Sequence, residues 1–200
     1  MTIRTGTLVR TTDQATLDSL CASSLDWLML DGEHPSVGLD EMAAMLRGIR
    51  GRLPAYARVR SLDEALITHA LADGAAGIIV PNVDTAAQAA ESVRLVRASA
   101  WPSARVVVQA ESVAAVHHIA AIVAVAGIEW VLIGPYDLTK SLGIPEQFDA
   151  PAFHDAVRTI ERACLAAGVP VGIFGMTPER VAPFIEAGHT WVVVGIDRAG

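Results

Sequence analysis

Titratable side chains follow four apolar, strand-like runs of this chain, and together they could form one polar site. Asp31, Glu33 and His34 follow the run 28–30, and Arg60 ends the run 56–60. Two further runs, 106–110 and 131–133, are followed by Glu111 and, a few residues on, by Asp137. If these runs are parallel strands of one β/α barrel, their ends share one face, where such barrels carry their chemistry. Two carboxylates, a histidine and an arginine at that face predict a metal-assisted enzyme.

The carboxylates of Glu111 and Asp137 are the candidate metal ligands. They follow consecutive predicted strands, and neighbouring strands lie about 4.8 Å apart, so both could reach one ion. Carboxylates plus water are what Mg²⁺ and Mn²⁺ prefer, whereas no set of His and Cys residues accompanies them to favour zinc. The alternative is that each acid caps a helix or pairs with a base.

His34 is the candidate general base, because a neutral imidazole can take a proton when a carboxylate orients it. Asp73, at the end of the third predicted helix, is one candidate for that carboxylate. Asp31 and Glu33 lie nearer in sequence, and Glu33 could instead bind a metal-bound water from behind the site. A solvated histidine in a loop is the other interpretation.

Arg60 is the candidate for stabilising negative charge, since a permanently charged, forked guanidinium suits a carboxylate or a developing enolate oxygen. A surface ion pair is the alternative. Arg58 has the same side-chain parity as Arg60, so the two could exchange roles if the register of the strand differs from the predicted one.

Strand-like and helix-like segments alternate along the chain. Strands are predicted near 5–10, 26–31, 54–60, 76–81, 104–110, 129–133, 169–174 and 190–194, and helices near 13–23, 39–50, 63–73, 85–99, 112–125, 150–167 and 178–187. Ser61 with Glu64, and Thr85 with Gln88, fit the capping box, and the first of these places Arg60 just before a helix. We therefore expect an α/β fold, a compact (β/α)8 TIM barrel, as a single domain over residues 1–200.

Composition restricts the partners and the location. The net charge is −7 and the fifteen basic residues form no run, which argues against nucleic acid. The sequence shows neither a signal peptide nor a bilayer-spanning segment, so we expect a cytoplasmic protein without membrane attachment. The chain ends after the eighth predicted strand without a terminal helix, and the apolar surface left open there predicts a homo-oligomer.

Six motifs in this order resemble the HpcH/HpaI aldolase family, the class II pyruvate-dependent aldolases, over nearly the whole chain. They are the segments 26–34 (DWLMLDGEH), 59–60 (VR), 79–81 (IVP), 108–111 (VQAE), 133–138 (IGPYDL) and 194–197 (VGID). The resemblance implies a TIM barrel and a lyase that reversibly cleaves 4-hydroxy-2-oxo acids to pyruvate and an aldehyde, through a metal-bound pyruvate enolate.

The resemblance also implies roles for individual residues. A divalent metal (Mg²⁺, Mn²⁺ or Co²⁺) would be held by Glu111 and Asp137, with no organic cofactor. His34 paired with Asp73 would be the acid/base, and Arg60 would stabilise the enolate. The remaining site residues implied are those that hold pyruvate, Gln109, Gly134, Pro135 and Tyr136, and those that support the reacting groups from behind, Asp31 and Glu33.

The chain departs from the family pattern in two places. The segment before the fifth strand, 99–105, is shorter than in typical members, and the terminal helix that members often exchange between subunits is missing. Two alternatives therefore stay open: a non-catalytic or assembly paralogue, and a lyase or synthase of the citrate-lyase branch that acts on a CoA thioester. The Asp-Gly-Glu-His segment favours the aldolase branch, and no basic groove for the CoA phosphates is visible.

Overall fold

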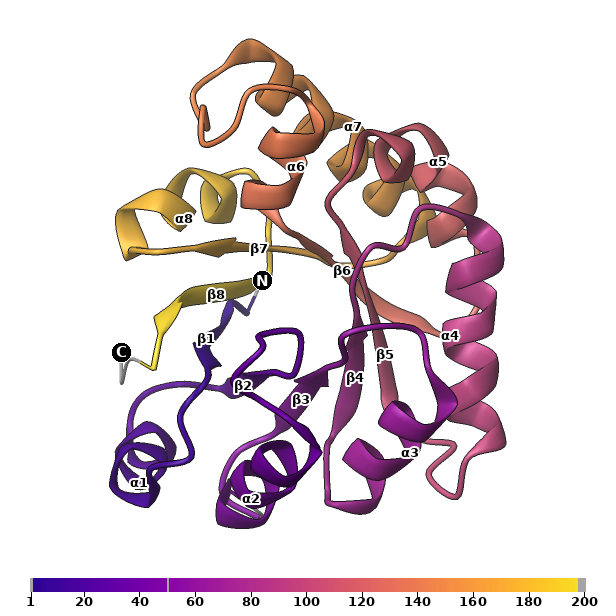
Figure 1. Ribbon diagram of the computed structural model, residues 1–200. Coiled ribbons are helices and arrows are strands. Elements are labelled where there is room, and N and C mark those ends of the chain that lie inside the picture. The colour runs from indigo at the N-terminus through magenta and orange to yellow at the C-terminus, as the bar shows by residue number, and fades with distance from the viewer. Residues whose placement is uncertain (1, 50, 198–200) are drawn as a thin grey trace.

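The computed structural model describes residues 2–49 and 51–197, and within them eight parallel strands close into a barrel (Figure 1). Each strand pairs with its neighbours in chain order, and β1 closes the barrel against β8. The strands are β1 (Arg4–Val9), β2 (Trp27–Asp31), β3 (Ala55–Arg58), β4 (Gly77–Val80), β5 (Arg105–Ala110), β6 (Ile128–Ile133), β7 (Val171–Gly175) and β8 (Trp191–Ile196). The predicted (β/α)8 TIM barrel is confirmed.

Helices surround the barrel, as Figure 1 shows. Those in the described residues are α1 (Gln14–Ala22), α2 (Leu39–Ile49), α3 (Glu64–Ala72), α4 (Ala86–Ala98), α5 (Val113–Val123), α6 (Pro135–Ser141), α7 (Pro151–Ala167) and α8 (Pro178–Glu186). The sequence pattern predicts all of them except α6, whose seven residues are too few for a helical period to stand out. This short helix matters, because its first turn carries Asp137.

The predicted end of β3 is wrong by two residues. The strand ends at Arg58, and the N-cap of α3 is Asp63 instead of Ser61. The carboxylate of Asp63 accepts hydrogen bonds from the backbone N–H groups of Ala65 (2.8 Å) and Leu66 (3.0 Å). The Ser61 capping box therefore does not form, and Arg60 belongs to the loop between β3 and α3. By contrast the predicted cap at Thr85 is confirmed, since its hydroxyl accepts from the Gln88 N–H at 3.2 Å.

An aromatic layer fills the barrel near the N-terminal ends of the strands. Trp130 and Trp191 stack with ring centroids 4.8 Å apart, and Trp27 packs edge-on against both of them and against Tyr56. Glycine opposite the rings is required for space: a Cβ at Gly6 would lie 2.6 Å from the Trp27 ring. These rings close one end of the barrel, so that a cavity can form only at the other end.

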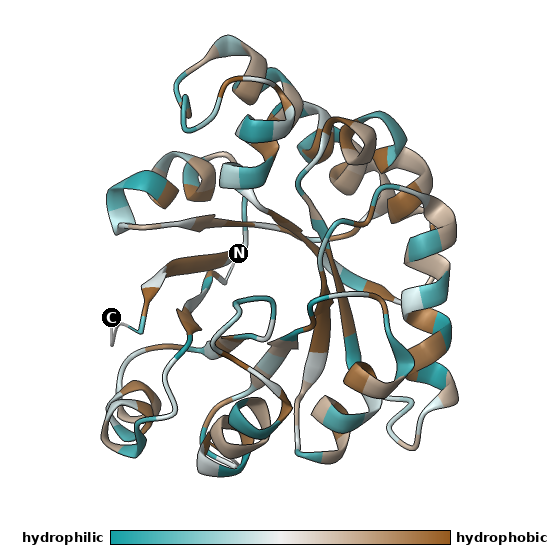
Figure 2. Cartoon of the chain, in the orientation of Figure 1, coloured by the Kyte–Doolittle hydropathy of each residue, from teal (hydrophilic) through white to brown (hydrophobic). Residues whose placement is uncertain are grey.

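A second apolar core lies between the barrel and the helices, and the outer helix faces are more polar, as Figure 2 shows by hydropathy. Cys21 and Cys164 are free thiols. Among the described residues, none of the helices combines the length and the hydropathy that crossing a bilayer requires. The prediction that a terminal helix is missing concerns the chain after β8, and residues 198–200 there lie outside the described residues.

Candidate active site

A cavity of about 350 Å³ opens at the C-terminal ends of the barrel strands. Its polar lining comes from four elements: Arg10 after β1, Arg58 of β3, Gln109 of β5 and Asp137 of α6. Apolar side chains make up much of the rest of the wall. A few polar groups converging in a largely apolar pocket are typical of a small-molecule site.

Glu111, directly after β5, lies buried beside this cavity with 2 % of its surface exposed. Its Oε1 accepts a hydrogen bond from the Asn82 N–H at 2.9 Å, and its Oε2 accepts one from the side-chain amide of Gln109. Asn82 has φ 53°, a left-handed conformation that asparagine tolerates better than most residues and that aims its N–H at the carboxylate. Gly134 leaves room for the carboxylate, because a Cβ there would overlap it.

The pKa of Glu111 is raised to about 7, mainly by burial and also by the negative charges of Glu33 and Asp137. The Asn82 N–H and Arg58 act in the opposite direction, but their effect is smaller than that of burial. Burial also raises the pKa of Glu33, against the opposing effect of Arg58. The protein thus holds a carboxylate in a site that favours its neutral form unless a positive charge is added.

Three oxygen donors fit such a positive charge. Gln109 is buried, and its Oε1 has no hydrogen-bond partner among residues 2–49 and 51–197, which is costly unless a ligand completes it. The Glu111 carboxylate lies against the same amide, and Asp137 lies in the first turn of α6, which follows β6. No group of three or more His, Cys, Asp or Glu residues that could hold a metal occurs in the described part of the chain. Two carboxylates and an amide oxygen fit Mg²⁺ or Mn²⁺, which keep coordination positions for water and substrate.

Arg58 of β3 lies in the cavity wall within a network of ion pairs. Its Nε (3.0 Å) and Nη2 (2.5 Å) donate to Oδ1 of Asp31, and its Nη1 lies 2.7 Å from Glu33 Oε2. The other oxygen of Asp31 accepts from Arg10 Nε at 2.7 Å. Asp31 is fully buried and so joins two arginines at the mouth of the barrel. Asp31 and Glu33, predicted to support the reacting groups, are thus placed behind Arg58.

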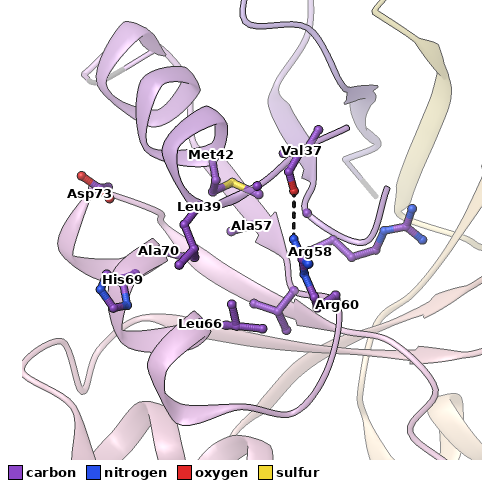
Figure 3. Close-up of a pocket in the computed structure, with 13 residues that line it drawn as sticks. Val37, Leu39, Met42, Ala57, Arg58, Arg60, Leu66, His69, Ala70 and Asp73 are labelled. Atoms are coloured by element: carbon purple, nitrogen blue, oxygen red, sulfur yellow. Dashed lines mark hydrogen bonds between the residues drawn. The ribbon is translucent and has the colours of Figure 1, made fainter. Parts of the chain in front are cut away.

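Arg60, predicted to stand at this mouth, lies outside it. Its side chain is exposed and donates from Nη2 to the Val37 carbonyl at 3.2 Å. Arg60 lines a separate pocket of about 30 Å³ next to α2 and α3, and Figure 3 shows it turned toward Val37 with Asp73 on the opposite side. The correction follows from the earlier end of β3, which leaves Arg58 at the place expected for Arg60.

The expected pairing of His34 with Asp73 does not form within this chain. His34 is half-buried on the loop after β2, and its Nδ1 lies 2.8 Å from Ser36 Oγ. Asp73 follows α3 and pairs with Arg47 of α2 at 3.1 Å. Asp73 is engaged by α2 within the described residues, so its role as the group that orients His34, which the family resemblance implies, stays a prediction.

The structure brings together most of the other predicted residues. Glu111, Gln109, Gly134, Pro135, Tyr136 and Asp137 all lie in or against the one cavity. Sequence reasoning missed Arg10 and Asn82. Arg10 could have been recognised from the sequence, because it is a charged residue that directly follows a strand. Asn82 could not, because it contributes its backbone N–H, which its residue type does not reveal.

This chain is similar to known proteins over nearly its whole length. The model of a family described as HpcH/HpaI aldolase/citrate lyase matches residues 4–199. A 4-hydroxy-2-oxovalerate aldolase of Rhodococcus jostii is 34% identical over 205 residues, which cover 89% of this chain and 80% of that protein. A 2-dehydro-3,6-dideoxy-6-sulfogluconate aldolase of Pseudomonas putida is 29% identical over 224 residues, which cover 97% of this chain and 86% of that protein. The crystal structure of an HpcH/HpaI aldolase/citrate lyase family protein from Burkholderia cenocepacia superposes with a TM-score of 0.91 and 26% identity, over 98% of this chain and 89% of that one.

Proposed function

The chain belongs to the HpcH/HpaI aldolase/citrate lyase family, and from this premise we propose that it reversibly cleaves 4-hydroxy-2-oxo acids to pyruvate and an aldehyde. The observation that carries the proposal is the group of Gln109, Glu111 and Asp137 at one side of the cavity, facing the arginines Arg58 and Arg10. Oxygen donors and guanidinium groups around one cavity suit a substrate that carries a carboxylate and develops negative charge on a ketone oxygen.

We propose that Glu111 and Asp137, with Gln109 Oε1 beside them, hold a divalent cation. When bound, that cation polarises the substrate's keto group and lowers the cost of removing a proton from, or breaking a bond to, the adjacent carbon. The raised pKa of Glu111 supports the assignment, because a buried carboxylate with neighbouring negative charge gains most from an added cation. That the cation is Mg²⁺, Mn²⁺ or Co²⁺ stays a prediction.

Arg58 takes the role that the sequence assigned to Arg60. Two carboxylates fix its guanidinium at the cavity wall, so it is oriented before a substrate arrives. A fixed positive charge there can balance the charge that grows on the ketone oxygen as the carbon–carbon bond breaks. Gly134, Pro135 and Tyr136 line the cavity beside Asp137 and would hold pyruvate by close contact.

The acid/base role of His34 stays a prediction. The Ser36 N–H donates to His34 Nδ1 at 3.3 Å, which favours the tautomer with its proton on Nε2. His34 would first take the proton of the substrate's 4-hydroxyl group as a base and then, as an imidazolium, return a proton to the pyruvate carbon. The cytoplasmic location and the homo-oligomer likewise stay predictions.

Pyruvate release tests the proposal. The protein is incubated with 4-hydroxy-2-oxo acids of several chain lengths, and pyruvate is measured by its reduction with lactate dehydrogenase and NADH. We expect release that depends on Mg²⁺ or Mn²⁺, stops with a chelator and returns when metal is added back. Pyruvate binding without release from any of these acids would contradict the proposal and favour the non-catalytic paralogue.

A further inference from the structure

Thr139 of α6 carries a fully buried hydroxyl group that the proposed function does not use. Its Oγ1 donates to the Tyr136 carbonyl at 2.9 Å and accepts from the Glu146 N–H at 3.1 Å. The Thr139 carbonyl also accepts from the Ile144 N–H at 2.9 Å. Thr139 therefore joins the short helix α6 to the loop 142–150, which lies between α6 and α7.

Glu146 adopts a strained backbone conformation at this junction. Its φ is 59°, in the left-handed region that residues other than glycine rarely adopt. Such a residue stays there only where the contacts around it compensate for the strain. Glu146 is exposed, and its backbone N–H donates to the buried Thr139 hydroxyl. The Thr139 hydroxyl thus helps to fix the path of the loop as well as the end of α6.

Ser141, the last residue of α6, makes a second junction. Its Oγ accepts a hydrogen bond from the Val113 N–H at 3.0 Å. Val113 is the first residue of α5, and its N–H is among those that have no partner within their own helix. Glu111 lies two positions before Val113. Through Ser141, α6 is therefore hydrogen-bonded to the segment that carries Glu111.

Asp137 depends on α6 for its position. The Glu111 carboxylate is held by two hydrogen bonds of its own. The Asp137 carboxylate makes no hydrogen bond or ion pair with residues 2–49 or 51–197, and Asp137 is exposed. A helix of seven residues is not stable by itself, so its contacts with the rest of the protein decide where its first turn lies. The hydroxyls of Thr139 and Ser141 supply two of these contacts.

We infer that Thr139 and Ser141 are positioning residues, whose hydroxyls hold α6 so that Asp137 and Glu111 can bind one cation together. Neither of them lines the cavity, so both act through Asp137. The inference rests on the proposed function for the role of Asp137 as a metal ligand. Ligands of a small divalent ion must stay within about 0.5 Å of their places, so a small shift of α6 would weaken metal binding even in a folded barrel.

Metal binding tests the inference without catalysis. Electron paramagnetic resonance of free Mn²⁺ gives its Kd for the wild type and for two variants that each remove one hydroxyl. Thr139→Val should raise Kd about tenfold, because a buried hydroxyl with two hydrogen bonds is lost, and Ser141→Ala, at an exposed position, about threefold. Thr139→Ser keeps the hydroxyl and should bind Mn²⁺ within about twofold of the wild type.

A matched control and a fold control accompany these variants. Thr159→Val removes a threonine hydroxyl whose partners, Asp155 and Arg162, lie in the same helix α7, and it should keep the wild-type Kd. Urea unfolding should show that each variant is folded in the binding buffer. If Thr139→Val does not fold, Ser141→Ala alone decides. An unchanged Kd in the folded variants, or weaker binding that Thr139→Ser does not avoid, would overturn the inference.

Amide hydrogen exchange of the metal-free protein supplies a second measurement. The amides of α6 should exchange about tenfold faster in Thr139→Val than in the wild type, because the contact that holds the short helix is lost. Those of α3, which lies elsewhere on the barrel, should exchange as in the wild type (Figure 1). Equal protection of α6 in Thr139→Val and the wild type would overturn the inference.

Exchange of the pyruvate methyl protons separates this inference from the proposed function. At saturating Mn²⁺, Thr139→Val should exchange these protons within about threefold of the wild type, because its hydroxyl positions a metal ligand and contacts no substrate. A loss that persists when the site is saturated would overturn the inference. A wild type that binds Mn²⁺ tenfold more tightly than Thr139→Val but neither exchanges protons nor cleaves any 4-hydroxy-2-oxo acid would refute the proposed function and support the positioning role. A wild type that binds no Mn²⁺ would refute both.

Discussion

Replacing Glu111 by glutamine should make the metal-free protein less sensitive to pH. Glu111 is almost fully buried, and its pKa in the folded protein is about 7, compared with an ordinary value of 4.5. Ionisation therefore costs more free energy in the folded state than in the unfolded state. The stability associated with neutral Glu111 is complete below about pH 4.5 and is lost as the pH rises through about 7.

The size of this loss follows from the shift in pKa. Each unit corresponds to about 1.4 kcal/mol, so a shift from 4.5 to about 7 amounts to about 3 kcal/mol at pH values above 7. Glu111→Gln has nearly the same shape but cannot ionise, and its free energy of unfolding should not contain this loss. The variant should therefore gain about 3 kcal/mol relative to the wild type between about pH 4.5 and about pH 8.

Urea unfolding in the presence of a chelator measures this difference at several pH values. Only the change with pH is compared, so a constant cost of the altered hydrogen bond to Gln109 does not affect the result. Excess Mn²⁺ should restore the stability of the wild type at high pH and leave Glu111→Gln unchanged, because metal binding stabilises only a fold that binds it. A difference that stays constant with pH, or that changes in the opposite direction, would refute the reasoning about the buried carboxylate.

Three further predictions concern the same site. Arg58→Ala should lower kcat/KM for aldol cleavage about a hundredfold or more, while Arg60→Ala should change it by less than about twofold, and similar losses in both would contradict the placement of Arg58 at the cavity. Gly134→Ala should leave the circular dichroism spectrum intact but abolish the stabilisation by Mn²⁺, since a Cβ would lie 2.7 Å from Gln109 Nε2 and overlap the Glu111 carboxylate. Asp31→Ala should lower the free energy of unfolding by about 3 kcal/mol in urea titrations, because it leaves Arg10 and Arg58 without their buried partner. A change below about 1 kcal/mol would show that these two ion pairs do not stabilise the fold.

The fold could be predicted because its signals are local. Buried β-rich runs alternate with capped amphipathic segments, and eight repeats of that kind have few arrangements other than a closed barrel. The short helix α6 escaped prediction because Gly134 and Pro135 look like a loop. In the folded chain the same two residues start a helix, with proline at its first position, where a missing N–H costs nothing.

A residue of the candidate site could be predicted only where the end of a strand alone places that residue at the cavity. Glu111 and Asp137 follow strands whose ends are unambiguous, and both lie at the cavity. The end of β3 was ambiguous, because Ser61 resembles an N-cap as closely as Asp63 does. Taking Ser61 as the N-cap led to the prediction that Arg60, instead of Arg58, lies at the end of the strand. Asp73 depends on contacts between α2 and α3 that sequence spacing does not contain.

The most direct test of the central claim is exchange of the pyruvate methyl protons in D₂O, followed by proton NMR, because it requires the pyruvate half of the site and no aldehyde. We predict exchange that needs Mg²⁺ or Mn²⁺ and that falls about a hundredfold or more in Glu111→Gln and in Arg58→Ala. The wild-type signal should return after chelation when metal is added back. Exchange that is absent from the metal-loaded wild type, or unchanged in both variants, would contradict the account.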